Sequence, residues 1–292
     1  MFDIQSIYQA QDVSDAIRAL VEHPNARVIA GGTDLLLRIR QGKLARCALV
    51  SIHGLPELTG IHQTDQGEMV IGALTTFRQL TQDPLIRENL SMLAGAAAQV
   101  GAPQIQAMGT VGGNLCNGAT SADTASSLFA YQAQLVIAGP ADSRTIPIDQ
   151  FYTGPGQVDL QPWEILREIR IPRASYQDCR GRYYKYALRN ALDIALLGAA
   201  VLVRLSPDRR KLDRVRVAFG VAGPTPMRAL ETERALTGLP LAEAVSLIPS
   251  LVRAEIQPRD SQRASRAFRL HIGGVIAQRA LIGAIQDGGG AL

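Results

Sequence analysis

Cysteine and histidine are scarce in this sequence of 292 residues. The three cysteines, Cys47, Cys116 and Cys179, are odd in number and lie far apart, and no two of them are spaced as C-x-x-C. This pattern argues against a disulfide framework, a zinc site or an iron–sulfur cluster within the chain, and it fits a reducing compartment. The four histidines are scattered as well, so we predict no metal site.

Long apolar runs and a strong charge of either sign are also missing. The longest apolar run, Ile194–Val203, has ten residues, which is too short to span a bilayer. The N-terminus has an acid at Asp3 and no apolar signal segment, so we expect a cytoplasmic protein without membrane association. Thirty Lys and Arg against 26 Asp and Glu give a net charge of +4, too mild an excess to predict a nucleic-acid partner.

What is present is a mixture of helical and strand patterns. An amphipathic helix is expected at 13–23 with Ser14 as its N-cap, a hairpin at 58–74, and a helical pattern at 77–100 that is interrupted at Pro84. Further strand patterns lie at 27–30, 47–52, 133–138, 165–172, 182–205, 214–223 and 224–229, and two helical patterns at 239–254 and 262–286. This order predicts an α+β fold.

The length and a polar, turn-like segment near the middle predict two domains. The segment "PRASYQDCR" follows the last strand of the first half, and the pattern after it is rich in strands and then in helices. We predict a first domain at 1–176, with subdomains at about 1–53 and 54–176, and a second domain at 177–292.

The stretch "GTVGGNLCNGATSAD" at 109–123 is rich in glycine, amide and hydroxyl residues and holds no Lys or Arg. Its spacing fits neither the dinucleotide-binding G-x-G-x-x-G pattern nor the P-loop. Gly112 and Gly113 have no Cβ, so their N–H groups can converge on a phosphate without a cation. An ionised Asp123 only accepts hydrogen bonds, so we expect it to face a donor such as a sugar hydroxyl or a ring N–H.

A second turn of similar composition, "AGGTD" at 30–34, offers another cradle. One diphosphate could lie between the two turns, and a diphosphate joined to a polyol would suit both the amides and the acid. The alternative is that both are ordinary tight turns, since glycine first of all marks a conformational need. Composition alone leaves both possibilities open.

These motifs resemble the FAD-binding medium subunit of molybdenum hydroxylases, a family that includes carbon monoxide dehydrogenase and the xanthine dehydrogenases. The family's A-G-G-x-[ST] turn is intact at Ala30–Thr33, and its T-x-G-G-[NS] turn at Thr110–Asn114. Ordered matches to bacterial xanthine dehydrogenase flavin subunits continue along the chain, in "QIQAMGTVGGN", "GPGQV", "EILREIRIP", "YYKYALRNALDIALLG" and "AFGVAGPTPMRA".

The resemblance implies a fold and a set of cofactor residues. The first domain would be an FAD-binding domain of the vanillyl-alcohol-oxidase (PCMH) type, and the second a domain like that of carbon monoxide dehydrogenase flavoproteins, with a small antiparallel sheet and helices. Matched residue by residue, the FAD site comprises Arg27, Val28, Ile29, Ala30, Gly31, Gly32, Thr33, Asp34, Gly109, Thr110, Val111, Gly112, Gly113, Asn114, Asp123, Leu166 and Lys185. Thr33 stands where relatives that bind flavin covalently have a His, so we expect non-covalent FAD.

Four residues also have plain structural interpretations. Without the resemblance, Leu166 would be a core residue of a strand and Lys185 an exposed lysine. Asp193, which falls in the family's loop near the isoalloxazine, could equally be a turn residue. Cys116 is interpreted as a packing residue, because nothing basic nearby would lower its pKa.

The function implied is electron transfer in a xanthine dehydrogenase-type, purine-oxidising complex. A large subunit with a molybdenum cofactor and a small subunit with [2Fe–2S] clusters would be the partners, in a hetero-oligomer expected to be a dimer of heterotrimers. Electrons would pass through FAD to NAD⁺, with no catalytic side chain needed in this chain. The alternatives are the flavin subunit of a carbon monoxide or N-heterocycle dehydrogenase, a stand-alone flavin reductase of the same fold, and a non-catalytic nucleotide-binding module.

Overall fold

A small parallel sheet begins the fold. The structure, a computed structural model, describes residues 2–292. The sheet has the order β1-β3-β2 and comprises β1 (Ile4–Gln9), β2 (Arg27–Ile29) and β3 (Cys47–Ser51). α1 (Val13–Glu22) packs on it, and α2 (Leu35–Arg40) follows the turn after β2. The predicted helix at 13–23 is confirmed, but its N-cap is Asp12, whose carboxylate accepts the N–H of Asp15 at 2.7 Å.

An antiparallel sheet of five strands follows. Its order is β4-β5-β10-β6-β7, and its strands are β4 (Ile61–Gln63), β5 (Met69–Gly72), β6 (Gln134–Ala138), β7 (Ser143–Pro147) and β10 (Ile165–Ile171). The predicted hairpin is confirmed as β4–β5, which turns at Gly67 with φ +76°. A short ribbon of β8 (Tyr152–Gly154) and β9 (Gln157–Val158) lies between β7 and β10 in the chain, after α9 (Ile148–Phe151), and η1 (Pro56–Leu58) precedes β4.

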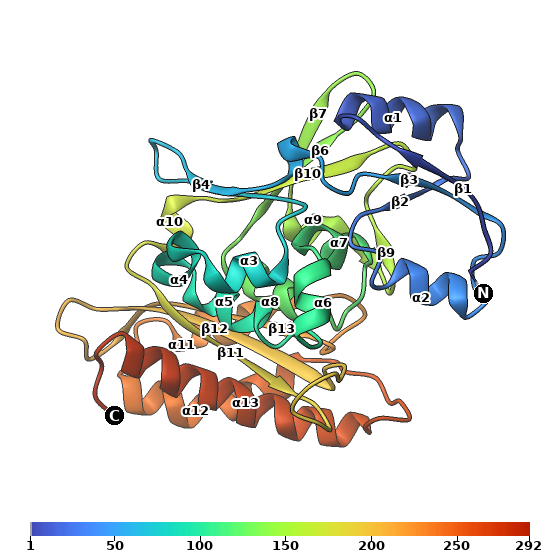
Figure 1. Ribbon diagram of the computed structural model, residues 1–292. Coiled ribbons are helices and arrows are strands. Elements are labelled where there is room, and N and C mark those ends of the chain that lie inside the picture. Colours follow the sequence, from blue (N-terminus) through green and yellow to red (C-terminus); the bar gives the residue numbers. More distant parts are fainter. Residues whose placement is uncertain (1) are drawn as a thin grey trace.

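Six short helices separate this sheet from the second half of the molecule (Figure 1). They are α3 (Phe77–Gln82), α4 (Pro84–Asn89), α5 (Ser91–Ala97), α6 (Pro103–Met108), α7 (Val111–Cys116) and α8 (Asp123–Ala130). The pattern at 77–100 is broken at Pro84, as predicted, and again at Leu90. The glycine-rich stretch, interpreted as a turn, instead contains α7 and the start of α8, and Thr110 caps α7 by accepting the N–H of Gly113 at 3.1 Å.

The second half is an antiparallel sheet with helices on one face. The linker helix α10 (Arg173–Tyr176) leads into strands β11 (Arg180–Tyr186), β12 (Leu197–Leu205), β13 (Leu212–Gly220) and β14 (Met227–Arg228), which pair in chain order, and the chain ends with α11 (Leu230–Leu236), α12 (Leu241–Glu255) and α13 (Arg266–Asp287). The predicted strands and the two long helices are confirmed, except that a loop at 187–196 divides the pattern at 182–205 into β11 and β12; α11 was not predicted. The α+β fold is confirmed as well.

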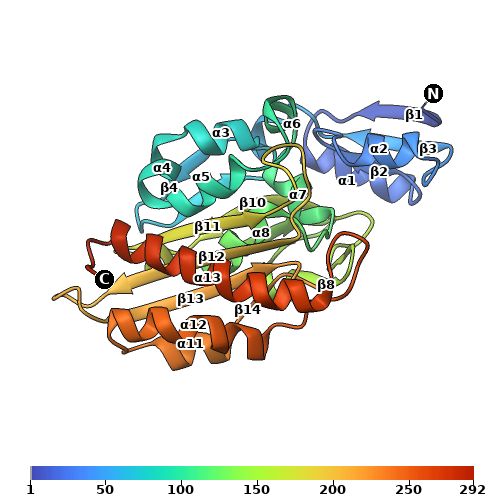
Figure 2. The same ribbon diagram turned by 90° about the horizontal axis from the view of Figure 1, so that it is seen from below.

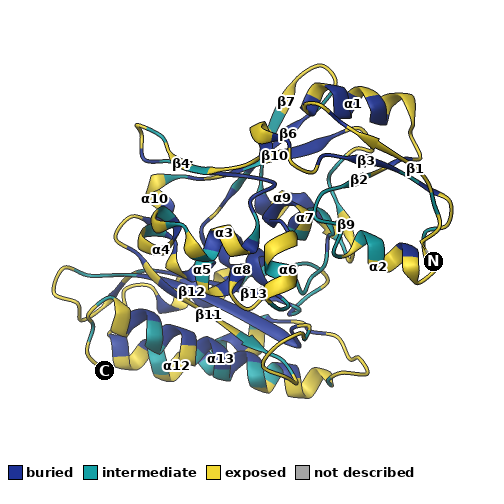
Figure 3. Ribbon diagram, viewed as in Figure 1, coloured by how far each residue is buried: buried dark blue, intermediate teal, exposed yellow. Residues whose placement is uncertain are grey.

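The C-terminal sheet is buried on both faces, because alternate side chains enter different cores. On one face Val201, Val203 and Val217 pack with α12 and α13. On the other, Ala200 and Ala218 share a core with the helices of the first half, including α5 and α8 (Figure 2). The burial pattern shows the same sandwich, with α8 buried along its length and β12 and β13 buried over most of theirs (Figure 3). The face of this sheet toward α5 and α8 therefore joins the two halves.

Among residues 2–292, no helix combines the length and the apolar character that crossing a bilayer would require.

Candidate functional site

The two glycine turns lie against each other. The backbone of Gly31 approaches the end of α6 so closely that a Cβ there would lie 1.8 Å from the carbonyl oxygen of Met108 and 3.3 Å from Cα of Gly109. Real Cβ atoms do not come so near to other atoms, so residue 31 must be glycine for this contact to exist. Segments far apart in the sequence thus form one continuous surface.

The first turn has unused backbone donors. Gly32 has φ +71°, the left-handed conformation that glycine favours, and its carbonyl accepts the N–H of Leu36. In the part of the chain that the structure describes, no protein acceptor is within hydrogen-bond reach of the N–H groups of Gly31, Gly32, Thr33 or Asp34. All four residues are at least partly exposed. Successive free amides around a left-handed residue form a nest that attracts an anion.

In the second turn, the four amides from Val111 to Asn114 are all used within the protein, although no bond is donated by the buried N–H of Thr110 in the part of the chain that the structure describes. The N–H of Val111 donates to Thr75 O and that of Gly112 to Ala73 O, both at 2.9 Å. The N–H of Gly113 donates to the Thr110 hydroxyl, and that of Asn114 to the Thr110 carbonyl at 3.0 Å. The expectation that the amides of Gly112 and Gly113 converge on a phosphate is therefore wrong, because the protein itself uses them. Gly113 lies within α7 and does not have a positive φ, so its backbone conformation does not itself require glycine.

What the second turn offers a ligand is bare surface and one amide side chain. Gly113 is exposed and has no side chain to cover the turn. Oδ1 of Asn114 accepts the hydroxyl of Thr124 at 2.7 Å, which leaves the Asn114 NH₂ group to donate elsewhere. Gly109 and Thr110, by contrast, are buried. This turn therefore suits contact with a flat or apolar group more than charge compensation.

Asp123 and Lys185, which come from different halves of the chain, meet in a buried ion pair. Nζ of Lys185 lies 2.8 Å from Oδ2 of Asp123, and each side chain is 8% exposed. The hydroxyl of Tyr183 donates to Oδ1 of Asp123 at 2.7 Å. Burial raises the pKa of the Asp123 carboxyl, and the charge of Lys185 and the two hydrogen bonds oppose that rise. The donors expected for Asp123 are thus present within the protein.

A small cavity opens beside Lys185. Its volume is about 270 Å³, and its lining includes Gln99, Lys185 and the loop after β11. Asp193 organises this loop, because its carboxylate accepts the N–H groups of Leu188, Arg189 and Ile194 at 2.9–3.0 Å. The turn interpretation of Asp193 therefore has direct support.

The positions of the remaining predicted residues say less about how a cofactor would bind. Val28 and Ile29 are partly buried on β2, and Arg27 is exposed at its start. Leu166 is 3% exposed, in the core that also holds Val111. Cys116 is partly exposed as a residue, yet protein around its sulfur raises the pKa of the thiol to about 12, which leaves it unreactive at neutral pH and supports the packing interpretation.

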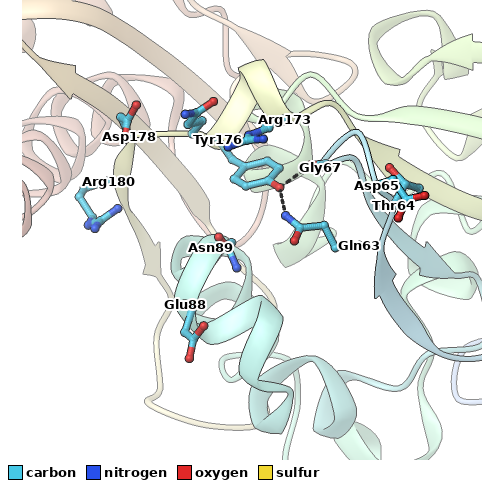
Figure 4. A pocket seen from close by; sticks show the side chains of 11 residues that line it. Gln63, Thr64, Asp65, Gly67, Glu88, Asn89, Arg173, Tyr176, Asp178 and Arg180 are labelled. Carbon is cyan, nitrogen blue, oxygen red and sulfur yellow. Dashed lines mark hydrogen bonds between the residues drawn. The ribbon is translucent and has the colours of Figure 1, made fainter.

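A larger pocket, of about 460 Å³, lies elsewhere, between the β4–β5 hairpin, α4 and the linker (Figure 4). The hydroxyl of Tyr176 at its wall donates to Gly67 O at 2.5 Å and accepts from the side chain of Gln63 at 2.6 Å. None of the residues predicted to bind FAD lines this pocket. The free amides near Gly31 and the cavity beside Lys185 are therefore the better candidate site, despite the smaller volume.

The residues present fit a flavin dinucleotide. The nest at 31–34 suits a diphosphate, the bare surface at Gly113 suits a group packed closely against it, and the cavity at Lys185 is walled by polar side chains. Tyr183 was missed by the sequence analysis. Its position two residues before Lys185 on a strand, and so on the same face, is the signal that could have found it.

Comparisons with known proteins agree with this assignment. Residues 2–174 match the family described as the FAD binding domain in molybdopterin dehydrogenase, and residues 182–284 match the CO dehydrogenase flavoprotein C-terminal domain. The chain is 39% identical to the xanthine dehydrogenase FAD-binding subunit of Escherichia coli O157:H7 over 293 residues, covering 100% of both. It is 30% identical to the carbon monoxide dehydrogenase medium chain of Hydrogenophaga pseudoflava, covering 88% of each.

Solved structures show the same architecture. Carbon monoxide dehydrogenase from Hydrogenophaga pseudoflava matches with a TM-score of 0.91 at 28% identity, over 99% of both chains. Quinoline 2-oxidoreductase from Pseudomonas putida 86 matches with a TM-score of 0.91 at 25% identity, over 99% of both chains.

Proposed function

The chain belongs to the FAD-binding subunits of the molybdenum hydroxylase family, an oxidoreductase family, and from this premise we propose that it carries electrons from a partner's iron–sulfur clusters to NAD⁺ in a xanthine dehydrogenase-type complex. The observation that carries the assignment of the site is the row of unused amides at residues 31–34, against which the second turn is packed. The similarity to a xanthine dehydrogenase subunit along the whole chain supports the finer assignment.

The site residues proposed are those that the sequence predicted, with roles adjusted to the geometry. The amides of Gly31 to Asp34 would hold the diphosphate, and the surface at Gly113 and Asn114 would pack against the same molecule. Asp123 and Lys185 would border the flavin ring from the cavity between the two halves. Because Thr33 offers only a hydroxyl, we propose that the cofactor is held without a covalent bond.

FAD bound there would supply the redox chemistry, accepting electrons singly and releasing two of them as a hydride. The chain's own part is to bind and orient the cofactor and to set the charge around it. The Lys185 ammonium has an ionised partner in Asp123, so the pair presents little net charge to a neighbouring ring. No side chain is assigned as a catalytic acid or base.

The proposed partners are a large subunit with a molybdenum cofactor and a small subunit with [2Fe–2S] clusters, in a dimer of heterotrimers in the cytoplasm. The proposed substrate of the complex is a purine such as hypoxanthine or xanthine, which would be selected in the large subunit. A carbon monoxide or N-heterocycle dehydrogenase would use a flavin subunit of the same fold, so the substrate must be identified on the complex.

The test is to purify the complex from its native host through a tag on this chain. We expect two further subunits to co-elute, flavin absorbance that denaturation releases as free FAD, and NAD⁺ reduction with a purine. A lone monomer without flavin would contradict the proposal. Flavin and partners with carbon monoxide or a heterocycle as the only substrate would contradict the xanthine assignment alone.

The isolated chain gives a second test. Reconstituted with FAD, it should pass electrons from NADH to an artificial acceptor and should not hydroxylate purines. Hydroxylation by this chain alone would overturn the division of labour proposed here.

A further inference from the structure

Tyr183 occupies a special position among the tyrosines of β11. It is 7% exposed and points toward α8, whereas its neighbour Tyr184, on the opposite face of the strand, is 37% exposed. Its hydroxyl donates to Oδ1 of Asp123 at 2.7 Å, while Lys185 takes Oδ2. Burial raises the pKa of Tyr183 well above its usual value, so the phenol remains a donor at every physiological pH.

Lys185 has more hydrogen-bond donors than it has acceptors within the protein. Its ammonium has three N–H donors. Inside the protein Nζ contacts two acceptors, Oδ2 of Asp123 at 2.8 Å and the carbonyl of Gln99 at 3.0 Å. One donor is therefore left over, on a residue that lines the cavity at the loop after β11. The direction of that last N–H depends on where the Asp123 carboxylate is held.

A glycine in the neighbouring strand leaves space for the Tyr183 hydroxyl. Lys185 pairs with Gly198 on β12, and Gly198 pairs in turn with Gly220 on β13. A Cβ at Gly198 would lie 2.8 Å from the Tyr183 oxygen. Glycine at that position thus makes room for the hydroxyl, and the contact with Asp123 depends on this local arrangement.

We propose that Tyr183 is a positioning residue of the cofactor site: its hydroxyl holds the Asp123 carboxylate against Lys185 and so directs the remaining N–H of Lys185 toward the flavin. This inference rests on the proposed function, since it requires FAD beside Lys185. Tyr183 itself does not touch the flavin and acts through Asp123.

The test compares Tyr183→Phe with the matched control Tyr184→Phe in the FAD-loaded complex, by the dissociation constant of FAD and the midpoint potential of the flavin. Tyr183→Phe should weaken FAD binding by at most about three- to tenfold, because the bond that is lost lies within the protein and its net strength is the upper limit of its effect on the affinity. It should also raise the potential, because a less stabilised carboxylate balances Lys185 less well. The control should change neither quantity.

Two further variants test the direction in which the midpoint potential of the flavin changes. Asp123→Asn should raise the potential further, since the charge of Lys185 is then unbalanced, and Lys185→Met should lower it, since the charge of Asp123 is then unbalanced. If Tyr183 acts through Asp123, adding Tyr183→Phe to Asp123→Asn should have no further effect on the potential. If Tyr183→Phe does not fold, 3-fluorotyrosine at 183 keeps the size of the side chain, and its stronger donor should lower the potential.

The results of these experiments distinguish a failure of the proposed function from a failure of the positioning role of Tyr183. Wild-type protein that binds no FAD would refute the proposed function. FAD bound as in the wild type with an unchanged potential in Tyr183→Phe, or weaker binding with an unchanged potential, would refute the positioning role of Tyr183 and leave the proposed function standing.

Discussion

The two glycine turns share a composition and differ in their backbone hydrogen bonds. Residues 31–34 keep their amides free, whereas the amides of residues 111–114 are all used within the protein. Glycine therefore has two roles here. In the first turn it allows a left-handed residue and a row of open donors, and in the second Gly112 lets the start of α7 pack closely on Ala73, next to the Met108–Gly109 segment that contacts Gly31. In the site that we propose, the first turn would bind the diphosphate and the second would support the first.

Gly31→Ala should have the largest effect, because it attacks the contact between the turns. The new Cβ would lie 1.8 Å from the carbonyl oxygen of Met108, so the turns must separate. We expect FAD to bind about ten- to a hundredfold more weakly, since overpacking costs about 1–3 kcal/mol. Flavin content of the purified variant and a titration with FAD measure this.

The matched control is Gly95→Ala, an exposed glycine of α5 with nothing within 4 Å of the added Cβ. It should leave FAD binding unchanged and stabilise the fold slightly, since alanine favours a helix by about 0.5–1 kcal/mol over glycine. Normal flavin content in Gly31→Ala would show that the contact between the turns is not needed for binding.

Thr110→Val should lower the stability of the protein without lowering its affinity for FAD. Valine keeps the shape of threonine and removes the hydroxyl that caps α7, which should lower the free energy of unfolding by about 1 kcal/mol. Affinity for FAD should stay close to that of the wild type, because no phosphate contact is assigned to this hydroxyl. Denaturant unfolding and FAD titration measure the two effects, with Thr81→Val on α3 as the control. A large loss of affinity without loss of stability would reverse the roles of the turns.

Asp34→Asn should produce the smallest change, and in the opposite direction. Removing a carboxylate beside a diphosphate while keeping the backbone N–H should tighten FAD binding about two- to fivefold, as exposed charge pairs contribute about 0.2–1 kcal/mol. Asp34 is exposed, although nearby protein atoms raise the pKa of its carboxyl by desolvation.

The pH dependence of FAD binding follows from the expected effect of the Asp34 charge. As the pH falls through the pKa of Asp34, the carboxyl becomes neutral, so the wild-type affinity should rise toward that of Asp34→Asn and the difference should vanish. Titrations between neutral and acidic pH measure this, with Asp65→Asn on the β4–β5 turn as the control. A variant that binds more weakly at every pH would mean that the Asp34 side chain contacts the cofactor favourably.

The sequence revealed much of the fold and only part of the site. The hydrophobic periods located α1, the helical region of α3 to α5, the long helices α12 and α13 and the central strands, because burial repeats along each of these elements, but they did not locate β1, β7 or the short helices α6 to α8. The glycine turns were found from composition, but composition does not say which amides are free. The acceptors of Val111 and Gly112, the carbonyls of Thr75 and Ala73, come from a separate segment. Tyr183 was missed because its partner Asp123 lies in the other half of the chain.

Amide hydrogen exchange at residue resolution, with and without FAD, tests the central claim most directly. Free amides should exchange quickly until a ligand accepts their hydrogen bonds, whereas amides already bonded within the protein should be slow throughout. We predict that FAD slows the exchange of the amides of residues 31–34 strongly and changes little at residues 111–114. Protection that appears at 111–114 upon FAD binding, with 31–34 unchanged, would contradict the account.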